Sequence, residues 1–158
     1  MRVSLLTTIA SKFGRRYDKG ARLITSAEVS ALIATHACLS GITPALKDGT
    51  YLVLDAGRMG DFLEDKVWTP GRKYKAERFD CDDFAAVARG QVLAAGDDEG
   101  FERAVFVAEI CHWPADGSVY HDALLLLDSE GLFFYEPQTG VRTRDIASKV
   151  RAAGEIWG

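Results

Sequence analysis

Hydrophobic side chains recur at helical spacing near the start of the chain. The run Thr25-Ser-Ala-Glu28 has the pattern of a capping box, in which the first and fourth residues close the N-terminus of a helix. Val29, Leu32 and Ile33 follow it with the three- and four-residue spacing of one helix face. The pattern therefore predicts an amphipathic helix that begins after Thr25.

The pattern in the middle of the chain predicts a short strand, a loop and a second helix. Residues 51–55 form a short apolar run that is typical of a strand. Residues 57–78 are rich in glycine and charge and are expected to form a long loop. A helix is then predicted from Cys81 to about residue 95, with Asp80 as its N-cap.

The spacing of hydrophobic residues changes from a helical to a strand-like pattern in the last third of the chain. Residues 104–111, 120–128 and 132–136 are runs rich in Val, Leu, Phe and Tyr, which favour strands. Asp128-Ser-Glu-Gly131 predicts the turn of a hairpin between the last two runs. Residues 146–153 are expected to form a short closing helix. Helices followed by an antiparallel sheet predict the α+β class.

Composition and charge narrow the class of protein without naming a function. With 158 residues, 47% of them hydrophobic, the chain is expected to be one globular domain over residues 1–158. A net charge of −4 makes neither nucleic acid nor an anionic membrane an expected partner, and no apolar stretch reaches the roughly 18 residues of a membrane span. The three cysteines do not form a disulfide framework, and free thiols favour a cytoplasmic location.

The densest group of reactive side chains is Arg78-Phe-Asp-Cys-Asp-Asp-Phe-Ala85. It places Cys81 in the first turn of a predicted helix, where unpaired N–H groups stabilise a thiolate and so favour a nucleophile. Asp80, Asp82 and Asp83 have the opposite effect, because their negative charge raises the pKa of the thiol. A cation or a protonated histidine is needed to balance them.

A histidine and an acid complete a candidate triad. His121 begins a strongly apolar strand, from which its ring could accept the proton of the Cys81 thiol. Glu136 ends the next strand, and the predicted hairpin brings it near His121, where it would orient the imidazole. Asp122 or Asp128 could take the place of Glu136. Cysteine, histidine and acid in this order predict acyl-transfer chemistry.

Along the chain, a cysteine at a helix start is followed by a histidine on a strand and then by an acid at a strand end, directly before a proline. This order resembles the papain-like superfamily, which includes transglutaminase-like proteins. More narrowly, Phe79-Asp-Cys-Asp-Asp-Phe-Ala85 with His121 and Glu136-Pro-Gln138 is similar to the C-terminal cysteine-protease domain of the Marasmius oreades agglutinin group of fungal lectins. The similarity covers roughly residues 65–140. It implies a papain-like fold, with N-terminal helices and the nucleophile Cys81 at a helix N-terminus packed on an antiparallel sheet. It also implies His121 as base and Glu136 as orienting acid. The sequence departs from those lectins in that these 158 residues carry no β-trefoil sugar-binding domain.

The resemblance further implies proteolysis that depends on a divalent cation such as calcium. Asp82 and Asp83 could bind that cation, with Gln138 as a further polar ligand, and the bound charge would relieve the repulsion of the thiolate. The backbone N–H of Cys81 and a donor in residues 68–78 would hold the oxyanion. The expected function is thus that of a cysteine protease, a thiol hydrolase that cleaves amide bonds of a peptide or protein. Two alternatives stay open: a transglutaminase-like acyltransferase, and a non-catalytic binding module on the same fold.

Overall fold

The computed structural model describes residues 20–67 and 80–158, in which antiparallel strands predominate. In chain order the elements are β1 (Arg22–Thr25), α2 (Ser26–Ala34), the 3-10 helix η1 (Ala37–Leu39), β2 (Thr50–Val53), α3 (Ala56–Lys66), α4 (Cys81–Asp98), β3 (Val107–Pro114), β4 (His121–Asp128), β5 (Gly131–Glu136), β6 (Val141–Thr143), the 3-10 helix η2 (Ile146–Ser148) and β7 (Val150–Trp157). The described residues therefore contain seven strands and three α-helices.

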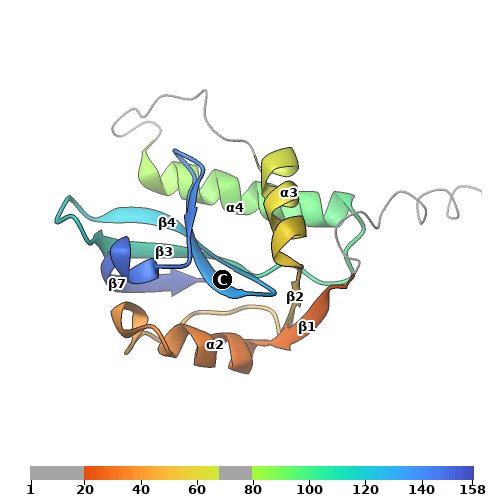
Figure 1. Cartoon of the computed structure of the whole chain (residues 1–158), viewed down its shortest axis with the longest axis horizontal. Helices are drawn as coiled ribbons and strands as arrows, with labels where there is room; N and C mark the ends of the chain where they lie inside the picture. Colours follow the sequence, from red (N-terminus) through yellow and green to blue (C-terminus); the bar gives the residue numbers. More distant parts are fainter. Residues whose placement is uncertain (1–19, 68–79) are drawn as a thin grey trace, which may run out of the picture.

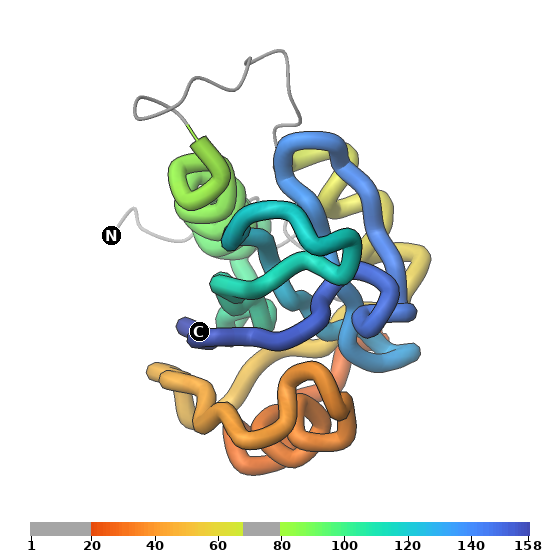
Figure 2. Tube along the Cα trace, turned by 90° about the vertical axis from the view of Figure 1, so that its left-hand side faces the viewer, coloured from red at the N-terminus to blue at the C-terminus, as the bar shows by residue number. Residues whose placement is uncertain are grey.

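The main sheet has five antiparallel strands in the order β6-β5-β4-β3-β7, and β1 and β2 form a separate two-stranded ribbon. The helix α4 packs on β4 and β3. Figures 1 and 2 both place α4 on one side of this sheet and α2 on the other, with the sheet between them. The strand β4 lies in the middle of this sheet, and the two hydrophobic cores cover its two faces.

The apolar run of β4 is explained by this two-sided burial. Leu124 and Leu126 pack with α3 and α4, whereas Leu125 and Leu127 pack with the core on the α2 side. Successive side chains of a strand point to opposite faces, so a strand that is covered on both sides has no polar alternation. Each of the four leucines is at most 1% exposed.

The two predicted helix starts are confirmed. Thr25 is the N-cap of α2, and it forms a reciprocal capping box with Glu28. Asp80 is the N-cap of α4, which begins at Cys81, and the carboxylate of Asp83 accepts a hydrogen bond from the Asp80 N–H at 3.3 Å. These caps satisfy N–H groups that the first turn of each helix leaves without partners.

Two predicted elements are wrong. The expected loop of residues 57–78 begins as the helix α3, because Asp55 caps it and Met59, Phe62 and Leu63 bury one helical face; residues 68–78 lie outside the described residues. The expected closing helix of residues 146–153 is instead the single turn η2 followed by the edge strand β7, which pairs with β3.

The predicted fold class is corrected with them. The sequence predicts N-terminal helices followed by a sheet, in an α+β, papain-like arrangement. In the structure β1 precedes the first described helix and pairs with β2, and strands outnumber helices, so the fold is mainly antiparallel sheet. Within residues 20–67 and 80–158, no helix has both the length and the apolar character needed to cross a bilayer.

Candidate functional site

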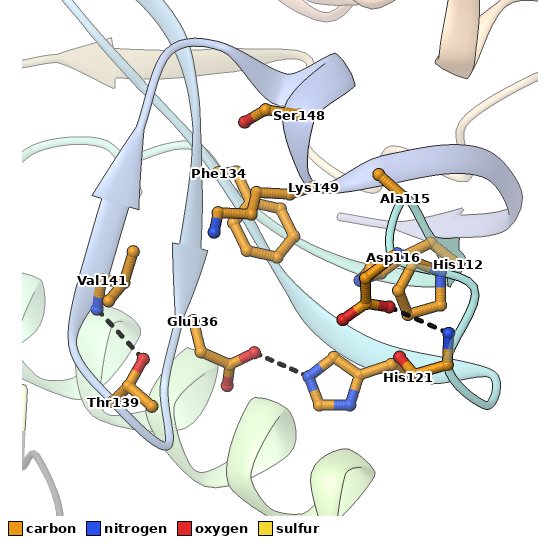
Figure 3. Close-up of a pocket in the computed structure, with 12 residues that line it drawn as sticks. His112, Ala115, Asp116, His121, Phe134, Glu136, Thr139, Val141, Ser148 and Lys149 are labelled. Carbon is orange, nitrogen blue, oxygen red and sulfur yellow. Dashed lines mark hydrogen bonds and ion pairs between the residues drawn. The ribbon is translucent and has the colours of Figure 1, made fainter.

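A pocket of about 430 Å³ lies where β4 begins, on the face of the sheet that carries His112 and His121. Figure 3 shows side chains from β3, β4 and β5 and from the segment before β7 around it. Its lining residues are His112, Pro114, Ala115, Asp116, Ser118, His121, Phe134, Glu136, Thr139, Val141, Ser148 and Lys149. The pocket thus combines apolar walls with carboxylate, imidazole, hydroxyl and ammonium groups.

His121 and Glu136 form the strongest polar contact of the pocket. The His121 Nε2 lies 2.6 Å from the Glu136 Oε2, as the dashed line in Figure 3 marks. The other Glu136 oxygen accepts a hydrogen bond from the N–H of Gln138 at 3.0 Å, which fixes the carboxylate. The hydrogen bond to Glu136 raises the pKa of His121 above its ordinary value, against the effect of burial. The pair therefore favours an imidazolium that is held in one orientation.

His112 lies behind this pair and is 1% exposed. Its ring packs edge to face against the rings of His121 and Phe134, with centroids 5.6 and 5.5 Å away. Burial, and then the nearby His121, lowers the pKa of His112, so the neutral ring is favoured. Neither of its ring nitrogens has a hydrogen-bond partner among the described residues.

The structure joins two of the three predicted triad residues, His121 and Glu136, by a hydrogen bond. Cys81 begins α4 as expected, but no hydrogen bond within the described residues joins its thiol to His121. The thiol instead interacts with Asp122, whose backbone N–H favours the thiolate and whose carboxylate opposes it. Burial is the largest effect, and together with Asp122 and Asp80 it raises the pKa of the Cys81 thiol. The helix start alone does not produce a thiolate here.

The two alternative acids lie elsewhere. Asp128, at the far end of β4, accepts a hydrogen bond from Arg144 at 2.7 Å. Asp122 is adjacent to His121, yet its side chain lies beside Cys111 on the face of the sheet that α4 covers. Neither carboxylate contacts the His121 ring, so Glu136 is the acid that orients it.

Two of the predicted metal ligands, Asp82 and Asp83, lie with Asp80 at the start of α4. These three residues can bring one carboxylate oxygen each within 4.8 Å of one another. The third predicted ligand, Gln138, follows β5, and its backbone N–H donates to Glu136. Asp80 and Asp83 serve the capping of α4, and a hydrogen bond with Asp80 is the main cause that lowers the pKa of Asp82. Hard oxygen ligands of this kind fit calcium in chemistry, but capping already explains their positions. Divalent-cation binding by Asp82 and Asp83 stays a prediction.

The sequence does not predict most of the polar groups that line the pocket. Asp116 and Ser118 belong to the turn between β3 and β4, where the Asp116 carboxylate accepts a hydrogen bond from the Ser118 N–H at 2.9 Å. Lys149 precedes β7 and reaches the pocket from a third segment (Figure 3). The turn pattern Asp-Gly-Ser was a local signal, but nothing in the sequence brings Lys149 to it.

Comparisons with known proteins give a fold relationship. No family model and no curated protein matches the chain. Among solved structures the chain is similar to a PSL1a–E64 complex, with a TM-score of 0.71 and 24% sequence identity over 86% of this chain and 51% of that one. It is also similar to the Polyporus squamosus lectin bound to the human-type influenza-binding epitope Neu5Acα2-6Galβ1-4GlcNAc, with a TM-score of 0.66 and 24% identity over 86% of this chain and 49% of that one. The chain spans about half the length of the structures it matches.

These neighbours correct the predicted family. They are structures of the Polyporus squamosus lectin PSL1a, which contradicts the expected assignment to the papain-like cysteine proteases. The predicted papain-like fold and the predicted thiol-hydrolase activity are corrected on the same ground. The individual roles of Cys81, His121 and Glu136 stay predictions.

Proposed function

We propose that the chain is a non-catalytic binding module and that its ligand, a glycan, occupies the pocket at the His121–Glu136 pair. The observation that carries the proposal is this pair, a charged hydrogen-bonding group that is already oriented at a pocket before any ligand arrives. Preorganised polar groups lower the cost of binding, because little side-chain freedom is lost when the ligand enters. The cytoplasmic location and the single-domain organisation stay predictions.

The chemistry of the lining supports a ligand with many hydroxyl groups. A sugar hydroxyl both donates and accepts hydrogen bonds, and the pocket offers acceptors in Glu136 and Asp116 and a donor in Lys149. Phe134 and Val141 add apolar surface beside these groups, as in most small-molecule sites. The volume of about 430 Å³ lies within the roughly 300–1,000 Å³ range of such sites.

The similarity to a lectin structure with a bound glycan supports the same class of ligand. Because the chain corresponds to about half of that lectin, glycan binding has to be measured on this chain directly. The raised pKa of the Cys81 thiol supports the non-catalytic part of the proposal.

Binding is tested by isothermal titration calorimetry of the purified chain with the trisaccharide Neu5Acα2-6Galβ1-4GlcNAc, with its desialylated form and with a panel of other short glycans. We expect saturable binding of at least one glycan, and a loss of about tenfold or more in Glu136→Gln, because a charge-assisted hydrogen bond is worth roughly 1.5–3 kcal/mol. Cys81→Ala serves as the control variant and should bind unchanged.

Two results would overturn the proposal. The first is the absence of binding to every glycan of the panel. The second is hydrolysis of a protein or peptide substrate, in buffer with calcium, that the Cys81→Ala variant does not carry out. The second result would restore a chemical role for the thiol, so the two failures are distinguishable.

A further inference from the structure

Exposed aromatic side chains gather on the face of the sheet opposite to the pocket, over β3 and β7. Trp113 is 45% exposed, Tyr120 40% and Trp157 49%. The rings of Trp113 and Tyr120 touch, with centroids 4.9 Å apart and an interplanar angle of 64°. Trp157 shares their face, because it pairs with Glu109, which lies four residues before Trp113 on β3.

Carboxylates occupy the same face between these rings. Glu109, Asp122 and Glu155 all act on Cys111, and together with burial, which is the largest cause, they raise the pKa of that thiol to about 12. Burial and the nearby Asp122 also raise the pKa of Glu109, and Arg89 only partly offsets them. Three carboxylates therefore lie close together on this face.

Tyr120 joins the aromatic and acidic groups into one surface. Its hydroxyl hydrogen-bonds with Cys111 and packs against Gly154 of β7, where a side chain larger than hydrogen would overlap it. The indole N–H of Trp157 donates to the Glu155 carboxylate at 3.1 Å. We call the set Glu109, Trp113, Tyr120, Asp122, Glu155 and Trp157 the acidic aromatic surface.

We propose that the acidic aromatic surface binds a segment of a partner protein that is rich in lysine and arginine. The faces of Trp and Tyr attract cations, most strongly guanidinium, and neighbouring carboxylates add ion pairs. The same carboxylates repel nucleic acids and anionic lipid surfaces, which makes a cationic polypeptide the complementary occupant. The proposal does not depend on glycan binding, because His112 faces the pocket and its neighbour Trp113 faces the other side of the sheet.

The test uses a synthetic octapeptide of alternating Arg and Gly, with a Glu–Gly octapeptide of equal length as the reference ligand. In ¹H–¹⁵N spectra of the chain we expect the Arg–Gly peptide to shift the indole signals of Trp113 and Trp157, and the Glu–Gly peptide to leave them in place. Trp113→Ala should weaken the affinity about fivefold, which corresponds to roughly 1 kcal/mol for a cation on an aromatic ring. The double variant Glu109→Gln, Glu155→Gln should weaken it further and reduce its dependence on salt.

Leu23→Ala provides a matched control, because Leu23 is 56% exposed on the separate β1–β2 ribbon. Its affinity for the Arg–Gly peptide should lie within twofold of that of the unchanged chain. All variants should keep the thermal unfolding midpoint of the unchanged chain. Equal affinity in Trp113→Ala and Leu23→Ala would overturn the proposal. So would peptide-induced shifts that avoid both indoles, or sedimentation with phosphatidylserine vesicles that Trp113→Ala abolishes, since the last result would make the surface a lipid site.

Discussion

Replacing Arg144 tests how the hairpin between β4 and β5 is held against the rest of the fold. The guanidinium of Arg144 lies 2.7 Å from the carboxylate of Asp128, whose side chain is 4% exposed, whereas that of Arg144 is 39% exposed. Arg144→Met therefore leaves a buried carboxylate without its cation. Breaking a buried ion pair costs about 3–5 kcal/mol. Asp128 keeps one hydrogen bond, from the N–H of Glu130 at 2.9 Å, and water can approach the vacated side, so we expect a loss of about 2–3 kcal/mol.

The loss is measured by urea denaturation, as a lower midpoint at unchanged slope, and by a fall in the thermal midpoint of about 4–12 °C. Arg142→Met is the control on the same segment, because the Arg142–Glu64 pair is exposed at both side chains and should be worth less than about 1 kcal/mol. Asp128→Asn in the Arg144→Met background should recover part of the loss, since it removes the unpaired charge. An Arg144→Met variant that is no less stable than Arg142→Met would contradict this role of the Arg144–Asp128 pair.

Three further outcomes follow from single contacts. Asp55→Ala removes the N-cap of α3 and should lower the free energy of unfolding by about 1 kcal/mol. Asp61→Ala within the same helix is the control and should change the free energy of unfolding little. Equal losses of the two variants in urea denaturation would contradict the capping role. Glu136→Gln should lower the pKa of His121 in an NMR titration, because it removes the carboxylate that raises this pKa. In the unchanged chain the raised pKa stabilises the fold below the ordinary imidazole pKa, and this stabilisation is lost as the pH rises through the raised pKa. The variant should therefore also lose this pH dependence of stability. His112→Phe should leave stability unchanged or raise it by roughly 1 kcal/mol, since it removes two buried nitrogens without partners; a clear loss would indicate that the nitrogens are satisfied in solution.

Elements with strong local signals could be predicted from the sequence. The caps Thr25 and Asp80 each lie directly before an apolar helical face, so both helix starts are where the pattern places them. The turn Asp128-Ser-Glu-Gly131 fixes the register of β4 and β5, because Asp128 pairs with Gly131. From that register follows the approach of His121 and Glu136, although the role of this pair stays a prediction.

Features that depend on tertiary packing could not be predicted in this way. The strand β7 contains Ala152, Ala153 and Gly154, which carry no strand pattern of their own, and it is a strand because β3 offers it an open edge. In α3, Gly57 and Gly60 obscured a helix that is stabilised by burial of its apolar face. The thiol of Cys81 lies beside Asp122 because the placement of α4 on the sheet decides its neighbours, and this placement has no local signature.

The strand order has a consequence for synthesis of the chain. β3 lies between β4 and β7, and β7 is the last of the five strands to leave the ribosome. Until β7 emerges, the second edge of β3 has no antiparallel partner, and an unpaired strand edge is a template for association with other chains. In the nascent protein, residues 107–114 are therefore the segment that most needs protection. The two register shifts between β3 and β7 bend the final edge strand, which makes the completed sheet a poorer template than its unfinished form.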